Sequence, residues 1–471
     1  MPITGLGGTK LAAAAGYSVS NSVRVNRADS PVLAFTPDST TDREKGTFSC
    51  WIKPSGAYAS AAVFGFGDDY AKAYFTDNPG VSMLFKPDGK HHTWAYGPWK
   101  EDPAAWQHWM FSWDTAQATP ANRGRCFRNG VEMTTSFSSA APTQSIDTDF
   151  NLSGTAMFVG NADKSGTRRE YWDGYLAEVA WIDGTQITDP TTFGEFSSTS
   201  PNTFIPKDFK DDVTFGDNGF YLEFKENGTD ADASGLGADT SGNNNHFTLT
   251  NYAATDQSID SPTNNFCVLN PHDKRSSATL KEGNLDISTT ANGWFGASGT
   301  LGFKKGFACY WEAKAISSAR LYFGLSRIGQ GVRKECLNDS AEGSADFDYM
   351  WRATSANTVF YGGSDQSITI TAISANDICA CHVATDGEVK FYKNDSLVVT
   401  FSTKLVDGYW YFPILSANAF GGGTESWQAN FGSPPYANSS SQSDPDGYGD
   451  FEYTTKSAYA LCTKNLANYG G

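Results

Sequence analysis

The stretch that constrains the fold most is residues 47–54, which read T-F-S-C-W-I-K-P. Phe48, Cys50 and Ile52 are apolar and occupy every second position. Because alternate side chains of a β-strand point to the same face, this period predicts a strand with a buried face, which Pro54 ends. Similar alternation recurs along the chain, with turn residues between the strands and almost no helical periodicity. The sequence therefore predicts a protein built from packed antiparallel sheets.

Length and composition agree with several sandwiches of short strands. The chain has 471 residues, which is too many for one ordinary core, so two or three domains are expected. Its residues are 39% hydrophobic and 14% aromatic, enough for a large core. The 47 glycines, together with abundant Ser, Thr, Asn and Asp, are typical of many strands joined by tight turns.

The charge disfavours nucleic acid and anionic membranes as partners. The formal net charge is -17 and the sequence pI is about 4.7, whereas phosphate binding needs concentrated Lys and Arg.

We find no signal peptide pattern and no apolar window of the ~18 residues that a membrane span needs. The eight cysteines are sparse for this length, which favours free buried thiols in a protein made in a reducing cytosol.

A series of motifs in the first part of the chain points to a known architecture. The motifs are W-Q-H-W-M-F-S-W-D at 106–114, C-F-R-N-G-V at 126–131, F-V-G at 158–160 and G-Y-L-A-E-V at 174–179. In order and spacing they resemble the laminin-G-like, concanavalin A-like jelly roll. The resemblance implies a β-sandwich. Ala177 stands where that family usually has an acidic residue before Glu178, which argues against a metal or polar contact there.

Between these strands, residues 91–99 read H-H-T-W-A-Y-G-P-W. Sugars bind by stacking on exposed aromatic rings, so Trp94, Tyr96 and Trp99 are candidate carbohydrate-binding residues. The alternative is that these rings cap the sandwich or are buried in a subunit contact.

A second candidate site lies in the D-T-S-G-N-N-N segment at 239–245. It resembles the D-x-S-G-N-G-N opening of many laminin-G-like domains. Oxygens of Asp239, Asn243 and Asn245 are the hard ligands that Ca²⁺ prefers, so calcium is a candidate cofactor, although none is required. The competing interpretation is a loop whose Asx side chains bond their own backbone.

The second half of the chain carries another set of motifs. They are C-Y-W-E-A-K at 309–314, F-Y-K-N-D at 391–395, Y-F-P-I at 411–414 and A-N-F-G at 429–432. These resemble a SPRY (B30.2-type) β-sandwich, which binds partners through loops at one end. Asp395 replaces the usual hairpin glycine, but Asn394-Asp395 can still adopt left-handed conformations.

The C-terminal sequence suggests a biological context. D-G-Y-G-D-F-E-Y at 446–453 and Y-A-L-C-T-K-N-L at 459–466 resemble segments that follow such sandwiches in tailed-phage virion proteins, particularly those of marine phages. The order of jelly roll, Asn-rich loop, SPRY-like sandwich and tail is similar to those proteins as well.

We therefore predict an all-β fold with two concanavalin A-like antiparallel β-sandwiches in tandem. The expected segments are an N-terminal arm at 1–20, either disordered or an anchor to a larger assembly, a laminin-G-like jelly roll at 21–200, a linker at 201–275 that could complete a sandwich, a SPRY-like sandwich at 276–435 and a tail at 436–471.

No catalytic residues are expected from the motifs. Concanavalin A-like glucanases place their acids on alternate residues of one strand, in an E-x-D-x-x-E run, which is absent here. Glu178 has no acidic partner two residues away. The chain also has no G-x-S-x-G, H-E-x-x-H or P-loop motif.

The expected function is that of a non-enzymatic virion structural protein of a tailed bacteriophage, in a fibre, spike or capsid decoration, made in the host cytoplasm. Its expected partners are other virion proteins, further copies of itself and a host surface polysaccharide. The alternatives are a secreted or surface lectin and, third, a glucanase.

Overall fold

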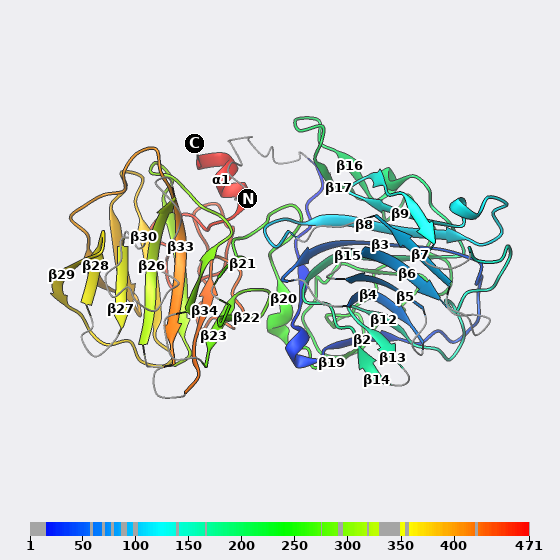
Figure 1. The fold of residues 1–471 in the computed structure, drawn as a ribbon, viewed down its shortest axis with the longest axis horizontal. Helices are drawn as coiled ribbons and strands as arrows, with labels where there is room; N and C mark the ends of the chain where they lie inside the picture. Colours follow the sequence, from blue (N-terminus) through cyan, green and yellow to red (C-terminus); the bar gives the residue numbers. More distant parts are fainter. Residues whose placement is uncertain are drawn as a thin grey trace. The chain divides into compact units, whose positions relative to one another are not determined.

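The chain folds into two compact units, Ala14–Thr263 and Asn264–Gly471, each described here by itself (Figure 1). Nearly all regular structure is β, and the α-helix of the described residues is α1, Thr463–Tyr469. The computed structural model describes residues 16–56, 60–67, 71–76, 80–85, 92–97, 102–137, 141–164, 167–274, 276–290, 295–317, 320–328, 349–353, 358–419 and 423–470.

The first unit is a sandwich of two eight-stranded antiparallel sheets. One sheet has the order β10-β9-β8-β3-β15-β1-β20, with β18 also paired to β15, and the other has the order β11-β7-β6-β5-β4-β12-β2-β19 (Figure 1). The strands of the first sheet are β1 Ser22–Val25, β3 Lys45–Pro54, β8 Gln107–Asp114, β9 Gly124–Arg128, β10 Val131–Glu132, β15 Gly174–Asp183, β18 Phe220–Leu222 and β20 Gln257–Ser258. Those of the second are β2 Val32–Phe35, β4 Ala61–Phe66, β5 Ala71–Thr76, β6 Gly80–Phe85, β7 His92–Tyr96, β11 Thr135–Phe137, β12 Met157–Val159 and β19 Thr248–Thr250.

The remaining elements of this unit are short. Two hairpins form separate two-stranded sheets, β13 with β14 and β16 with β17. These elements are β13 Ala162–Lys164, β14 Thr167–Arg169, β16 Gly194–Phe196, β17 Phe204–Pro206, and the 3-10 helices Arg27–Asp29, Pro120–Asn122, Pro190–Thr192 and Ala254–Asp256.

Strand β3 lies at the centre of the first sheet, paired with β8 on one side and β15 on the other. Its alternating residues Phe48, Cys50 and Ile52 belong to the core between the sheets, as the sequence predicts. Trp51, on the opposite face, is also buried, because Val19 and Phe204 pack over it. The outer face of this sheet is therefore covered by chain segments rather than by water, which the alternation alone does not reveal.

Residues 201–263 are built into the first unit. Strand β18 pairs with β15, β19 with β2 and β20 with β1. Strands from residues 201–263 thus belong to the two sheets of the first unit, whereas the boundaries 201–275 of the expected linker stay a prediction. At the N-terminus, residues 1–15 of the predicted arm lie outside the described residues, while Tyr17 and Val19 pack against the sheet.

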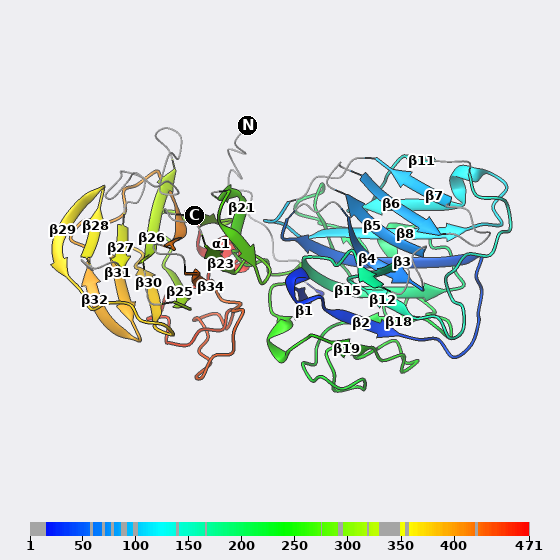
Figure 2. The same cartoon turned by 60° about the horizontal axis from the view of Figure 1, so that its bottom comes forward.

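The second unit is a sandwich of two seven-stranded antiparallel sheets, with orders β21-β24-β33-β26-β27-β28-β29 and β22-β23-β34-β25-β30-β31-β32. Figure 2 shows these sheets as facing layers, with the edge strands β29 and β32 at the same end. The strands are β21 Leu269–Lys274, β22 Thr279–Lys281, β23 Asp286–Thr289, β24 Phe295–Gly299, β25 Cys309–Ala315, β26 Arg320–Ile328, β27 Tyr349–Ala353, β28 Thr358–Tyr361, β29 Ser364–Thr369, β30 Ile378–Val383, β31 Val389–Lys393, β32 Ser396–Thr400, β33 Trp410–Asn418 and β34 Glu425–Asn430.

The predicted hairpin turn of this unit forms without its usual glycine. Asn394 and Asp395 both have positive φ, 46° and 65°, between β31 and β32. Short polar side chains tolerate this left-handed region better than other non-glycine residues do. The substitution in the family pattern therefore leaves the turn intact.

The C-terminal segment differs from an extended tail. Phe451, Leu461 and Cys462 are fully buried, and helix α1 follows them. Asp444 accepts hydrogen bonds from the Ala460 amide and the Asn465 side chain, which fixes the loop before the helix. The tail is thus part of the core of the second unit, a role that its Ser, Asp and Gly content hides.

Candidate functional site

The predicted sugar-stacking residues lie on β7, in the core of the first unit. Trp94 and Tyr96 are 0% and 4% exposed, and Trp94 packs against the ring of Phe85. Their ring faces are inside the sandwich, which contradicts sugar stacking for these two residues and favours the alternative that they belong to the core. Trp99 lies outside the described residues.

The predicted calcium loop is braced by its own hydrogen bonds. The carboxylate of buried Asp239 accepts from the amides of Tyr221, Ser241 and Asn245 and from the Ser241 hydroxyl, at 2.8–2.9 Å. The side-chain amides of Asn243 and Asn245 both donate to the carbonyl of Gly219. These contacts fit the Asx-loop alternative, because NH and OH donors already use the oxygens of Asp239. Calcium at this loop stays a prediction that isothermal titration can test.

The chemically most distinctive group of the first unit is the carboxyl of Glu178 on β15. Glu178 has a positive φ of 50° and sits where the pairing of β15 with β3 shifts register between Ala177 and Ala180. A bulge of this kind re-aims a side chain, and a non-glycine residue pays conformational strain to occupy it. Glu178 is 3% exposed.

Two tyrosine hydroxyls donate hydrogen bonds to this carboxyl. Tyr17 donates to Oε2 of Glu178 at 2.6 Å, and Tyr221 donates to the same oxygen. The two hydroxyl oxygens are 3.1 Å apart. Tyr17 comes from the segment before β1 and Tyr221 from β18, so one carboxyl joins three parts of the chain. We call this group the Glu178 clamp.

The surroundings raise the pKa of Glu178. Burial raises its pKa from 4.5 to about 7, and the two tyrosine hydrogen bonds lower it by less than burial raises it. The same burial and the nearby carboxylate raise the pKa values of Tyr17 and Tyr221, so both hydroxyls remain donors. A largely buried acid with a pKa near neutrality is a feature that functional sites and structural clamps share.

A second acid lies close enough to interact with Glu178. Val179 of β15 is paired with Leu222 of β18, and Glu178 and Glu223 are the residues next to this pair along the two chain segments. Glu223 is paired with Lys225 at 2.5 Å and lies 4.0 Å from Lys210, and its charge raises the pKa of Glu178 further. Sequence reasoning missed this pair because it searched along one strand, and the partner comes from a strand pairing that the sequence does not specify.

A shallow pocket of about 340 Å³ lies on the same unit, but it does not reach the clamp. Its lining includes Lys210, Phe215, Asp217, Ser241 and Asn243, and neither Glu178 nor Glu223 is part of it. This pocket therefore offers a substrate no route to the Glu178 carboxyl.

Two further sets of buried polar side chains in the first unit bond within the fold. Lys53 and Asp260 form an ion pair at 2.6 Å with both side chains 1% exposed, and the Trp106 indole donates to Asp260 at 2.9 Å. His108 contacts the Ser49 hydroxyl at 2.9 Å, and burial lowers its pKa to about 3, so it stays neutral. Within the described ranges, no group of three or more His, Cys, Asp or Glu side chains could hold a metal ion. The described helices are also too short or too polar to cross a bilayer.

Comparison with known proteins supports the architecture of the first unit. Residues 28–188 match a family model described as the Concanavalin A-like lectin/glucanases superfamily, in agreement with the jelly roll that the sequence predicts. The match covers a minority of the chain. No curated protein matches the sequence.

Several solved structures share parts of the fold at low similarity. The SPRY domain of human HERC1 is 14% identical, with a TM-score of 0.28, and the alignment covers 34% of this chain and 96% of that one. A heptameric SAP-like pentraxin from Limulus polyphemus is 16% identical, with a TM-score of 0.28 and coverage of 37% and 80%. The CBM40 of a Ruminococcus gnavus IT-sialidase, bound to α2,3 sialyllactose, is 17% identical, with a TM-score of 0.23 and coverage of 34% and 85%. At these values the likenesses carry no functional argument.

Proposed function

We propose that this protein works by contact, as a non-enzymatic structural protein of a tailed bacteriophage particle, in a fibre, spike or capsid decoration. The resemblance of residues 446–453 and 459–466 to virion segments, and the order of the two sandwiches, support this context. The proposal includes synthesis in the host cytoplasm, assembly with other virion proteins and further copies of the chain, and attachment to a host surface polysaccharide.

One observation supports the proposal that the protein is not an enzyme: two buried glutamates, Glu178 and Glu312, bind segments of the chain itself. Glu178 and Glu312 both have pKa values near 7, the range of a general acid. Glu178 is closed by two tyrosine hydroxyls, and Glu312 is 0% exposed and accepts hydrogen bonds from the amides of Glu452 and Tyr453. Both carboxyls therefore hold chain segments in place, and neither faces solvent where a substrate could reach it.

The particle context is tested by locating the protein. Purified phage particles from the source of this gene are digested and analysed by mass spectrometry, and antibodies to the recombinant chain are applied in electron microscopy. We expect stoichiometric peptides from the particle and a regular labelling pattern. Recovery of the protein as a free monomer, with none in the particles, would overturn the proposal.

A lectin role is the second candidate, supported by the concanavalin A-like match at residues 28–188. A glycan array with the recombinant chain tests it. Selective binding by a protein that is absent from particles favours a free lectin, whereas binding by a protein found in particles assigns attachment to the virion protein itself.

A glucanase is favoured by one observation, that Glu178 and Glu223 adjoin the paired residues Val179 of β15 and Leu222 of β18 and interact electrostatically. Retaining enzymes use two carboxyls at short separation as acid and nucleophile. Release of reducing ends from β-glucans by the wild-type protein, lost in Glu178→Gln, would establish catalysis. We expect no release from either protein, because the hydroxyls of Tyr17 and Tyr221 cover the Glu178 carboxyl and keep a substrate away from it.

A further inference from the structure

The pocket of the first unit, about 340 Å³ in volume, lies between two loops. Residues 210 and 213–217 form one wall, and Ser241 and Asn243 form the other. We call it the two-loop pocket. Ligand pockets span about 300–1,000 Å³, and those that take a whole small molecule bury most of its surface. A shallow pocket near the lower limit suits one part of a longer molecule.

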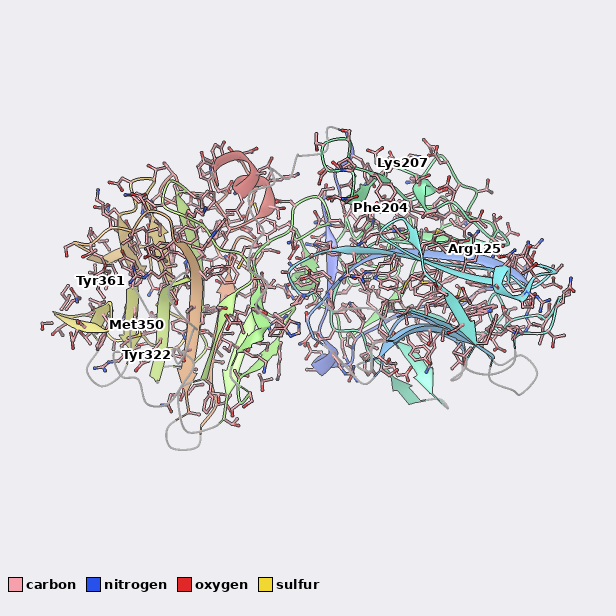
Figure 3. The ribbon with its side chains drawn as sticks, turned by 45° about the horizontal axis from the view of Figure 1, so that its top comes forward. Arg125, Phe204, Lys207, Tyr322, Met350 and Tyr361 are labelled. Carbon is pink, nitrogen blue, oxygen red and sulfur yellow. The ribbon has the colours of Figure 1, made fainter. Side chains whose placement is uncertain are left out.

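Aromatic packing holds the first loop in place. Phe209 and Phe215 are buried, and their ring centroids lie 4.8 Å and 6.1 Å from that of Tyr221. Asp212, between them in the chain, pairs with Lys207 at 2.7 Å, and Figure 3 labels Lys207 on the surface of the first unit. The lining residues are therefore positioned before a ligand arrives, which lowers the entropy cost of binding.

Two asparagine side chains join the walls of the pocket. Nδ2 of Asn243 donates to the carbonyls of Gly216 and Gly219, at 2.6 Å and 2.9 Å. Nδ2 of Asn245 donates to the carbonyls of Asp217 and Gly219, at 2.9 Å and 2.8 Å. Because two carbonyls accept from Asn243, the orientation of its amide is fixed, and its Oδ1 stays available as an acceptor for a ligand.

Other polar groups of the lining are also available. Thr214 and Asp217 are exposed, and within the part of the chain that the structure describes their side chains form no hydrogen bond or ion pair. The Lys210 side chain is 40% exposed and lies 4.0 Å from Glu223. The carboxylate accepts hydrogen bonds, the ammonium donates them and the hydroxyl does both. This mixture matches a ligand that carries many hydroxyl groups.

The charge of the pocket indicates which hydroxyl-rich ligand it takes. The lining holds one cation, Lys210, and one acid, Asp217, and Lys210 also lies near Glu223. The whole chain has a net charge of -17, so it repels acidic polymers unless a surplus of cations receives them. The two-loop pocket has no such surplus, which favours a neutral ligand.

We propose that the two-loop pocket binds a short stretch of a neutral polysaccharide through the hydroxyl groups of its sugar units. The inference rests on the proposed attachment to a host surface polysaccharide and deepens it, because it names the site and the class of polymer. An open pocket with few contacts binds weakly by itself. Several copies of the chain in one assembly would bind the repeating polymer with much higher avidity.

The first experiment measures binding of the full-length protein to immobilised polysaccharides by biolayer interferometry. The probes are mannan, galactan, dextran and laminarin, which are neutral, and alginate and polygalacturonate, which are acidic. We expect binding to at least one neutral polymer and none to the acidic ones. Binding to a neutral ligand should change less than about twofold between roughly 0.05 M and 0.5 M NaCl, because it does not depend on charge attraction.

The second experiment assigns the binding to the pocket. Thr214→Val and Asp217→Asn keep the size of each side chain, and we expect each to weaken binding about fivefold and the double variant about tenfold or more. The control is Asp211→Asn, which removes the same charge from an exposed residue of the same loop that does not line the pocket. We expect it to bind as wild type does. Equal melting temperatures confirm that all variants fold.

Three results would overturn the inference. They are a wild-type protein that binds none of the neutral polymers, a double variant that binds as tightly as wild type, or stronger binding to the acidic polymers that is lost at high salt. A double variant that still binds leaves the proposed attachment in place and moves it to another surface. Particle location is measured separately, so a protein found in virions that binds no polymer loses this inference and keeps its structural role.

Discussion

In both units a buried glutamate accepts hydrogen bonds that hold a chain segment in place, and the two sites differ in how firmly they hold it. Among the described residues, each unit has one buried glutamate whose pKa burial raises to about 7, Glu178 in the first unit and Glu312 in the second. Each glutamate accepts a hydrogen bond from a tyrosine of its own sheet, Tyr221 or Tyr310. Each also holds a segment near a chain end, Tyr17 in one case and residues 452–453 in the other.

The difference lies in the donors. Glu312 accepts from the Tyr310 hydroxyl, the Asn430 amide and the backbone amides of Glu452 and Tyr453, at 2.9–3.3 Å. Backbone donors cannot rotate away, so loss of this carboxyl strands them in the interior. The donors to Glu178 are tyrosine hydroxyls, which can turn to another acceptor. The comparison suggests that the Glu312 site is part of the core, whereas the Glu178 clamp can open locally.

The largest expected effect is that of Glu312→Ala. The substitution leaves two backbone amides and two side-chain donors without their acceptor, and we expect a loss of about 3 kcal/mol of unfolding free energy in the second unit. Urea unfolding followed by tryptophan fluorescence measures it. The control is Glu388→Ala, since Glu388 forms a partly exposed pair with Lys390 and should cost below about 0.5 kcal/mol. Equal effects of the two substitutions would contradict the comparison.

We expect a smaller effect from Glu178→Ala, about 2 kcal/mol in the first unit, because tyrosine hydroxyls recover part of their hydrogen bonding. The exposed acid Asp147, which pairs with Arg43 at 3.3 Å, provides the control substitution Asp147→Ala. If Glu178→Ala destabilises the protein more than Glu312→Ala, the first site is the stronger one and the comparison is reversed.

The pH dependence of the unfolding free energy should reflect the ionisation of both Glu178 and Glu312. Each folded pKa, about 7, lies above the value of 4.5 for an ordinary glutamate. Between these values the unfolded chain releases a proton that the folded chain keeps, so unfolding free energy falls as pH rises through this window and is level on either side.

We expect each glutamate to contribute a fall of up to roughly 1 kcal/mol per pH unit between pH 4.5 and 7. Glu178→Gln and Glu312→Gln should each remove one contribution, which shows as the difference in slope from wild type. Urea titrations at half-unit pH steps provide the measurement. A slope that neither Gln variant changes would show that other carboxyls cause it.

The sequence predicted strands better than it predicted their contacts. Alternation at Phe48, Cys50 and Ile52 placed β3 correctly, because a period of two is a local property. The burial of Trp51 depends on Phe204, 153 positions later, and no local pattern encodes that approach. The roles of Trp94 and Tyr96 were ambiguous for a related reason. An aromatic residue on a strand gives the same sequence pattern whether its ring stacks on a sugar or packs in the core.

Interactions across strands were the least predictable. Glu178 gains its partners Tyr17 and Tyr221 only when the bulge in β15 and the pairing with β18 are both in place. Glu312 is comparable, because its backbone donors at 452–453 come from a segment whose composition is that of a linker. Register is set by the packed structure as a whole, so these sites emerge only from the fold.

The smallest predicted effect tests whether the Glu178 clamp opens by itself. Tyr17→Phe removes one donor to Glu178 and leaves Tyr221 in place, so we expect about 1 kcal/mol or less of global destabilisation. Opening of the segment around residues 16–20 should nevertheless increase, because Tyr17 is its hydrogen-bonded contact with the carboxyl. Hydrogen exchange of that segment, resolved by mass spectrometry, is the readout.

Tyr310→Phe is the matched substitution in the second unit. It also removes a tyrosine hydroxyl from a buried glutamate, yet Glu312 keeps its backbone donors, so residues 452–453 should exchange no faster than in wild type. Faster exchange at 16–20 in Tyr17→Phe, with none at 452–453 in Tyr310→Phe, would separate a clamp that opens locally from one fixed in the core. Matching exchange in the two variants would mean that both glutamates hold their segments in the same way, and the kind of donor would then not decide how firmly a chain end is held.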